Sequence, residues 1–343
     1  MYSFTIIDVK DPQWADIVCR SYDYDFYHTQ SYHLLEKDDK PVLFLSKFND
    51  DFIGLPLIIR KIPNTHLYDC TSVYGYCGPI SNLNFEKISQ ELIVYFKENL
   101  YKYFKDNNII TAFSRLHPLI NVSSFFDNFG TVKDINKTIA IDLRIPMEQQ
   151  RKLFRKSTKS KLNQLRKKEF EVFEAIEKKD IDLYVEMYHS TMESVNATEK
   201  YYFDADYFYK FLDSRCFQKK LLLAKKDSKI IAGAIFTITN KVMQYHISAS
   251  TKLYLKDTPM KLILDEARLI ANELKLDFLH LGGGFGGNDD DSLFFFKSGF
   301  SDYRGLYQTW QMIVDDEKYN ELVKNNKSKN ETSFFPLYRY YKI

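Results

Sequence analysis

Cysteine is scarce in this sequence, and the four that occur have none of the spacings typical of metal or redox sites. Cys19, Cys70, Cys77 and Cys216 form no Cys-x-x-Cys pair and no set with histidine at zinc-ligand spacing. We therefore expect reduced, mostly packed thiols and no metal site. An HExxH motif and a Ser-His-Asp pattern are also missing, so the sequence gives no support to metal catalysis or covalent hydrolysis.

Long apolar runs and a strong excess of one charge are absent as well. No stretch approaches the ~18 apolar residues that a membrane-spanning helix needs, and the N-terminal residues do not combine a basic start with an apolar run. The net charge is +2, so any attraction to nucleic acid must be local. We therefore expect a cytoplasmic protein with no signal peptide and no stable membrane insertion.

The sequence does contain enough apolar material for two domains. It has 343 residues, of which 45% are hydrophobic. We attribute its 28 Phe and 25 Tyr residues to compositional bias rather than to an aromatic binding surface. In the first half, residues 41–48 and 52–61 are typical of a hairpin, and an apolar residue at every fourth position predicts a helix at 85–107. Strands are expected at 109–114 and near 138–143.

The second half has the same alternation of strands and helices. We expect helices at 181–192, 205–213 and 259–274, and strands at 170–176, 221–224, 230–239, 242–250 and 278–281. Two such halves indicate an α+β protein with mixed sheets. Pro146 marks a break, so we place the first domain at 1–145 and the second at 146–313, and we expect residues 314–343 to pack back onto the first.

Residues 279–300 form the most informative stretch. An apolar strand leads into five glycines in six residues, then three aspartates, Ser292 and an aromatic segment that carries Lys297. The glycines at 282, 284 and 287 match a GxGxxG dinucleotide fingerprint, but aspartates at 289–291 occupy the helix start, where a pyrophosphate would bind and be repelled. We therefore expect Asp291 or Ser292 to cap a helix. Glycines allow backbone amides to approach a ligand closely.

Two further segments of the second half are candidates for chemistry. A lone ammonium among Phe residues is costly to bury without an anionic partner, which makes Lys297 a candidate site residue. On the strand at 242–250, period-2 alternation places His246, Ser248 and Ser250 on one face and Tyr245 on the other. His246 is either a general base or a satisfied structural histidine.

Residues 151–168 hold nine basic residues and no acidic one. A solvated helix face usually mixes charges of both signs, so this stretch favours a phosphate ligand in RNA, a nucleotide or a diphosphate-linked lipid or sugar. A purely solvated face is the alternative. The turn-rich aromatic stretch at 74–79 either lines a cleft or is an ordinary loop.

Together these segments resemble a known family. Residues 279–300 are similar to the C-terminal signature of the FemAB/FemX-like proteins of the GNAT-like superfamily of acyl- and aminoacyltransferases, with Asp-Ser-Leu-Phe at 291–294 and Phe-Lys-x-Gly-Phe at 296–300. The remaining likenesses follow in the family's order: an aromatic segment at 27–32, a Tyr-Gly-x-Gly-Gly-Pro-like stretch at 74–79 with Cys77 at one glycine position, a basic helix at 155–159 and a central strand at 245–250.

The resemblance implies two tandem GNAT-like domains with a cleft between or across them. It implies direct transfer of an acyl or aminoacyl group to an amine of a cell-wall or surface-polysaccharide precursor, with Lys297 and amides of the glycine segment stabilising negative charge. A tyrosine, His246 or the substrate would take the proton. The candidate catalytic residues are Lys297, His246 and Tyr245. The candidate substrate-binding residues are Arg155, Lys156, Lys159, Tyr74, Tyr76, Tyr254, Gly282, Gly283, Gly284, Asp291 and Ser292.

The donor is either aminoacyl-tRNA or acyl-CoA, and we expect no tightly bound cofactor. GNAT enzymes cradle acyl-CoA in a glycine-rich loop after the central strand, whereas residues 251–258 contain no glycine. This favours aminoacyl-tRNA. The expected partners are a phosphate-bearing nucleotide-sugar or lipid-linked precursor and tRNA. The alternatives are a CoA-dependent sugar N-acyltransferase and an inactive phosphate- or RNA-binding module.

Overall fold

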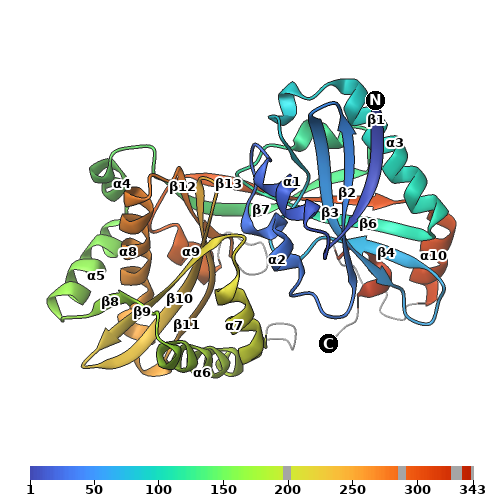
Figure 1. Ribbon diagram of the computed structural model, residues 1–343. Helices are drawn as coiled ribbons and strands as arrows, with labels where there is room; N and C mark the ends of the chain where they lie inside the picture. Colours follow the sequence, from blue (N-terminus) through green and yellow to red (C-terminus); the bar gives the residue numbers. More distant parts are fainter. Residues whose placement is uncertain (196–201, 285–290, 326–333, 341–343) are drawn as a thin grey trace. The chain divides into compact units, whose positions relative to one another are not determined.

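The computed structural model describes residues 1–195, 202–284, 291–325 and 334–340, which divide into two compact units (Figure 1). Unit 1 comprises Met1–Ile135 and Leu306–Ile343, and unit 2 comprises Asn136–Gly305. The sequence placed the division at the Pro146 break and at residue 313. The units instead divide inside two strands, β7 (Thr131–Asp142) and β13 (Arg304–Ile313), because each of these strands contributes residues to both units.

Unit 1 is built on a mixed sheet with strand order β1-β2-β3-β4-β6-β13. Only β4 and β6 run parallel to each other, and the short β5 pairs with β3. The predicted hairpin is confirmed as β2 and β3, and Asn49 in its turn has a φ of 55°. The bounds are β1 (Tyr2–Asp8), β2 (Lys40–Phe48), β3 (Asp51–Lys61), β4 (Tyr68–Thr71), β5 (Ile80–Ser81) and β6 (Ile109–Leu116).

Alternation along β2 gives this sheet two covered faces. Val42 and Phe44 pack into one cluster with α3, whereas Leu43 and Leu45 pack into another with α1. Helix α3 starts at Gln90, later than the predicted residue 85, because Ser89 caps it by accepting a hydrogen bond from the Leu92 amide. The helices of unit 1 are α1 (Gln13–Cys19), η1 (Phe26–His28), α2 (Gln30–His33), η2 (Phe85–Lys87), α3 (Gln90–Asp106), η3 (Ser123–Phe126), α10 (Asp316–Asn325) and η6 (Leu337–Arg339).

The C-terminal segment is fixed to unit 1 around one buried carboxylate. Asp69 is inaccessible to solvent and pairs with the guanidinium groups of Arg60 and Arg339, each at 2.8 Å. The Tyr338 hydroxyl donates a third hydrogen bond to it at 3.0 Å. Because a buried charge is stable only when it is paired and hydrogen-bonded, these contacts tie the last described residues to β3 and β4.

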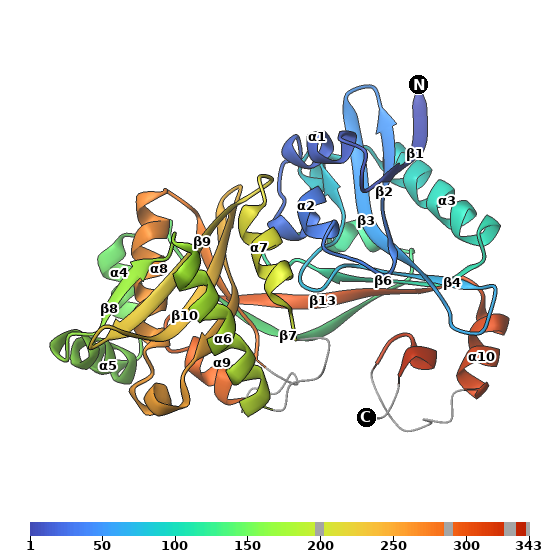
Figure 2. The ribbon, with the colours of Figure 1, turned by 60° about the horizontal axis from the view of Figure 1, so that its bottom comes forward.

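In unit 2 the strands follow the order β7-β12-β11-β10-β9-β8 and are also of mixed direction. Only β11 and β12 are parallel neighbours among them. Helices α5 and α8 pack on one face and α6 and α7 on the other (Figures 1 and 2). The mixed α+β class that the sequence predicted is confirmed. The strands are β8 (Glu171–Glu174), β9 (Gln218–Lys226), β10 (Lys229–Thr239), β11 (Val242–Ser250) and β12 (Phe278–Gly282).

The remaining elements of unit 2 include the predicted helices and two that the sequence did not indicate, α4 and η5. They are α4 (Met147–Leu153), α5 (Lys156–Lys167), α6 (Lys178–Ser194), α7 (Ala205–Asp213), η5 (Lys252–Asp257), α8 (Met260–Glu273) and α9 (Ser292–Lys297). None of the helices in the described residues combines the length and the hydropathy of a membrane span.

Two fully buried histidines lie in the short helices η1 and α2 of unit 1. Burial lowers the pKa of His28 to about 4 and the pKa of His33 to about 3. The ring Nε2 of His33 lies 3.0 Å from the Tyr27 carbonyl oxygen. Both rings are therefore neutral in the folded protein at physiological pH.

These histidines predict acid sensitivity of the fold. Because both pKa values are lowered, the unfolded chain binds protons below pH ~6.5 that the folded chain does not yet bind. The free energy of unfolding is then highest above that pH and falls as the pH decreases, by roughly 1.4 kcal/mol per pH unit for each histidine. Urea titrations at pH 7 and pH 5 measure this. His33→Gln keeps a donor for the Tyr27 carbonyl and should roughly halve the change of the unfolding free energy with pH. Equal unfolding free energies of the unmodified chain at both pH values would contradict the prediction.

Candidate active site

The pairing between the two parallel strands of unit 2 ends early. Val242–Gln244 of β11 pair with Phe278–His280 of β12, although β11 continues to Ser250 and β12 to Gly282. Both strands change register with their outer neighbours near this point: β12 shifts against β7 between His280 and Gly282, and β11 shifts against β10. Ile235 pairs with Ile247 and Phe236 with Tyr245, which leaves His246 as an extra residue in a β-bulge. A bulge bends its strand, so β11 leaves the parallel ladder beside the end of β12.

The bulge corrects one prediction about side-chain faces. His246 and Tyr245 do point to opposite faces, since the His246 ring stacks on Phe211 of α7 at 5.1 Å between ring centroids, while Tyr245 joins the core with α8. Ser248 was expected on the His246 face. Its Oγ instead accepts a hydrogen bond from the Tyr245 hydroxyl at 2.6 Å. The extra residue reverses the alternation for the rest of β11, so the expectation for Ser248 is wrong.

Lys297 meets Tyr245 and the glycine segment at this point. Its ammonium donates a 2.6 Å hydrogen bond to the Gly283 carbonyl and lies 5.7 Å from the centroid of the Tyr245 ring. The residue is only 7% exposed. Burial lowers the pKa of the ammonium to about 8, and the negative charge of Asp291 acts in the opposite direction.

The glycines and the helix cap give this site its local shape. Asp291 caps α9, because its carboxylate accepts a hydrogen bond from the Phe294 amide at 2.9 Å. A Cβ on Gly284 would lie 2.0 Å from this carboxylate, and Gly282 has a φ of 76°, so neither position accepts a larger residue without strain. Ser292 begins the helix. The predicted positions at 287, 289 and 290 lie outside the described residues.

A buried polar network holds the last paired residues of the two strands, and the sequence reasoning missed it. Nδ1 of His280 lies 2.6 Å from the Gln244 side-chain oxygen, and its Nε2 lies 2.8 Å from the Thr138 hydroxyl. Since a carbonyl oxygen only accepts, Nδ1 donates to Gln244 and Nε2 accepts from Thr138 in the neutral ring. A histidine inside an apolar strand, two residues before the glycines, was the available signal.

Arg155 connects the basic segment to α9. Its guanidinium donates to the Phe295 carbonyl at 3.2 Å and to the Ser298 hydroxyl at 3.0 Å, and it lies 3.8 Å from the centroid of the Phe295 ring. Lys159 donates to the backbone carbonyl of Lys152 at 3.1 Å. Lys156 is exposed to solvent. Arg155 therefore positions α9, while Lys156 offers its charge to solvent or to a ligand.

Several of the nine basic residues have a structural role that the sequence did not indicate. Arg151 and Arg166 both reach the buried carboxylate of Asp265 on α8, at 3.5 and 2.6 Å, and Arg268 pairs with it as well, at 2.8 Å. Lys168 pairs with Asp257 at 3.3 Å. The segment is thus neither a uniform ligand surface nor a uniform solvated face, because part of it holds α4 and α5 against α8.

Tyr254, Tyr74 and Tyr76 lie in other surroundings. Tyr254 of η5 packs edge-to-face on Phe170, at 6.3 Å between ring centroids. In unit 1 the backbone carbonyl of Tyr74 accepts a hydrogen bond from the Tyr32 hydroxyl at 3.0 Å, and the Tyr76 ring packs against Tyr27. The two aromatic segments that the sequence singled out, 27–32 and 74–79, therefore pack together.

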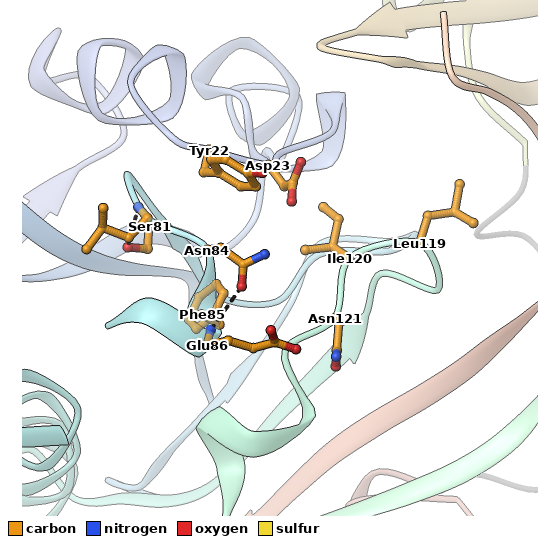
Figure 3. Close-up of a pocket in the computed structure, with 10 residues that line it drawn as sticks. Tyr22, Asp23, Ser81, Asn84, Phe85, Glu86, Leu119, Ile120 and Asn121 are labelled. Atoms are coloured by element: carbon orange, nitrogen blue, oxygen red, sulfur yellow. Dashed lines mark hydrogen bonds between the residues drawn. The ribbon is translucent and has the colours of Figure 1, made fainter. Parts of the chain in front are cut away.

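Next to these segments unit 1 has a polar cavity of about 210 Å³ (Figure 3). A buried hydrogen bond of 3.0 Å between Asp25 and Nε2 of His117 joins the two chain segments that lead into its walls. No sequence pattern indicated this cavity, because its walls are far apart along the chain. It is lined by Tyr22, Asp23, Ser81, Leu83, Asn84, Phe85, Glu86, Leu119, Ile120 and Asn121.

Comparison with known proteins gives the fold a precedent. No family model matches the sequence, and no curated protein matches it either. Among solved structures, FemX superposes with a TM-score of 0.71 and 11% identity over 92% of this chain and 99% of FemX. L-PGS from Bacillus licheniformis superposes with a TM-score of 0.58 and 11% identity, over 89% of this chain and 92% of L-PGS.

A tandem GNAT protein from the clavulanic acid biosynthesis pathway gives a TM-score of 0.53 and 8% identity, over 92% of this chain and 99% of that one. At such low identities the likeness speaks for the fold. The chain therefore has the fold of FemX and of tandem GNAT proteins, with two GNAT-like domains in series, as the resemblance of its segments predicted.

Proposed function

We propose that the protein is an acyl- or aminoacyltransferase that uses Lys297 at the end of the β11/β12 ladder. One observation carries the proposal: a nearly buried ammonium is held against a glycine carbonyl, and within the described residues no carboxylate lies at ion-pair distance from it. Burying such a charge without a counter-charge is costly, so the position suits a group on which negative charge develops. The FemX-like fold supports the same reaction class.

The chemistry needs an acceptor amine to attack the donor carbonyl. Negative charge then develops on the carbonyl oxygen, and an ammonium fixed beside it stabilises the tetrahedral intermediate. Among the described residues Gly283 takes one of the three N–H groups of Lys297, and we propose that the others serve that oxygen. Positioning of the two substrates supplies the rest of the rate enhancement.

The other two candidate catalytic residues fit less well as bases. Burial raises the pKa of Tyr245 to about 12, so its hydroxyl stays protonated and serves as a donor to Ser248. His246 stacks on Phe211 on the opposite face of the sheet. We therefore assign Tyr245 to shaping the Lys297 site and leave the proton of the amine to the substrate or to bulk solvent.

For the substrates we propose an aminoacyl-tRNA donor and a phosphate-bearing precursor of the cell wall or of a surface polysaccharide, in the cytoplasm. Residues 251–258 offer no glycine to cradle acyl-CoA, and Lys156 and Lys159 on α5 provide positive charge for phosphates. Thermal-shift screening with acetyl-CoA, charged tRNA and UDP-sugars distinguishes this donor from the CoA-dependent alternative, since a ligand of the native state raises the melting temperature.

The first test of this proposal is the substitution Lys297→Met. This change keeps the length of the side chain and removes its charge, so kcat with the donor found in the screen should fall about 10²–10³-fold. The melting temperature should stay near that of the unmodified chain. Lys10→Met, which removes an exposed charge, is the control and should leave both quantities unchanged. Equal losses of kcat and stability in Lys297→Met would mark the lysine as structural.

The pH dependence of kcat gives a second test. An ammonium with a pKa of about 8 is protonated below that pH, so a role in stabilising negative charge predicts a rate that falls as pH rises through 8. Lys297→Arg keeps a positive charge at all accessible pH values, so its residual rate should lose this falling limb. A rate that instead rises through pH 8 in the unmodified chain, with a rise that Lys297→Met loses, would indicate that Lys297 acts as a base.

A third prediction concerns phosphate binding by α5. Lys156→Glu combined with Lys159→Glu should weaken binding of the phosphate-bearing substrate and reduce the dependence of its affinity on salt. The matched control reverses two exposed lysines elsewhere in unit 2, Lys229 and Lys275, and should change neither. Titrations at low and high salt measure both effects. If the α5 variant and the control bind alike, the exposed lysines of α5 form only a solvated face.

A further inference from the structure

The short helix η5 exposes leucines although it is firmly held in place. Leu253 is 80% exposed and Leu255 52%, and no residue of the helix is buried. Only Tyr254, between them, turns inward to pack beside the unit 2 core. Two exposed leucines in one ordered turn indicate a surface that contacts an apolar partner when the protein functions.

Contacts at both ends show that η5 is an ordered element rather than a loose loop. At its start the Thr251 amide donates to the Ile231 carbonyl of β10 at 2.9 Å. At its end Asp257 pairs with Lys168 at 3.3 Å, and the Thr258 amide donates to the Leu255 carbonyl at 3.1 Å. The exposure of the leucines is therefore imposed by the fold.

Positive charge surrounds these leucines. Lys252 and Lys256 flank them within the helix, and both are exposed. Lys261 follows at the start of α8, and its pKa is lowered by burial and by the nearby charges of Lys161 and Arg155. The positive charges of α8 and of the start of α5 thus lie close together, a few residues along the chain from the lysines of η5. Two aspartates of this region are already engaged, since Asp257 pairs with Lys168 and Asp265 is buried among three arginines.

We propose that η5 docks unit 2 on an anionic lipid bilayer. Leu253 and Leu255 insert among the lipid headgroups, and Lys252, Lys256 and Lys261 contact the anionic headgroups. Aliphatic side chains between lysines are suited to a membrane surface, where apolar burial and attraction to anionic lipid add together. A nucleic acid would satisfy the lysines but leave the leucines exposed, because bases stack on aromatic rings. The proposal concerns binding alone and does not depend on the transfer reaction.

Cosedimentation of the full chain with vesicles tests this. The unmodified chain should bind vesicles of phosphatidylcholine mixed with phosphatidylglycerol and should not bind vesicles of phosphatidylcholine alone. Leu253→Ser combined with Leu255→Ser should weaken binding about tenfold, and Lys252→Glu combined with Lys256→Glu should weaken it at least as much. The control is Ile176→Ser, which removes an apolar side chain that is 82% exposed but lies next to the acidic Glu177 and not between lysines. This variant should bind the vesicles like the unmodified chain.

Three outcomes would overturn the proposal. The unmodified chain fails to bind the anionic vesicles, the leucine variant binds as tightly as the Ile176 control, or a single-stranded RNA binds η5 with an affinity that the lysine variant loses and the leucine variant keeps. Melting curves of every variant exclude unfolding as the cause. Turnover with water-soluble substrates is measured separately. A variant that loses vesicle binding but keeps this turnover therefore leaves the proposed transfer reaction unaffected.

Discussion

The arrangement of unit 2 depends on one constraint: an ammonium that is almost fully buried has to be hydrogen-bonded. Lys297 meets it through the Gly283 carbonyl at 2.6 Å. That contact requires the backbone after β12 to turn sharply toward α9, which the positive φ of Gly282 and the missing side chain of Gly284 allow. Asp291 then caps α9 and keeps Lys297 at the far end of the same short helix. The glycine cluster and the lysine are therefore two parts of one feature.

The sheet prepares the place where this feature lies. The parallel pairing of β11 and β12 ends where both strands change register with their outer neighbours. The bulge at His246 also places Ser248 on the side of Tyr245, whose hydroxyl donates to it. Gln244 and His280 are the last paired residues of β11 and β12. The buried His280 ring is hydrogen-bonded to the Gln244 side chain on one side and to the Thr138 hydroxyl of β7 on the other. Because a half-satisfied polar network would be costly in this core, the end of the ladder is fixed rather than adjustable.

Positive charge in unit 2 is divided between structure and surface. Arg151, Arg166 and Arg268 neutralise one buried aspartate and so attach α4 and α5 to α8. The lysines of α5 and η5 have no such task and remain at the surface. This division explains how a stretch without any acidic residue folds stably as the end of α4 and helix α5: its counter-charge comes from α8. Net charge along the sequence could not show which cations were neutralised in this way.

The sequence by itself determined the mixed α+β class, the hairpin of β2 and β3, the amphipathic α3, a helix cap at Asp291 or Ser292 and, through its segments, the likeness to FemX. These follow from local periodicity, turn residues and capping, which act over a few positions. The partners of Lys297, the face taken by Ser248, the role of His280 and the task of Arg151 and Arg166 were decided only by the tertiary structure. Each depends on residues far apart in the chain or on a one-residue change of register. Such pairings lower the free energy only when the whole sheet and its helices are in place, so local patterns do not specify them.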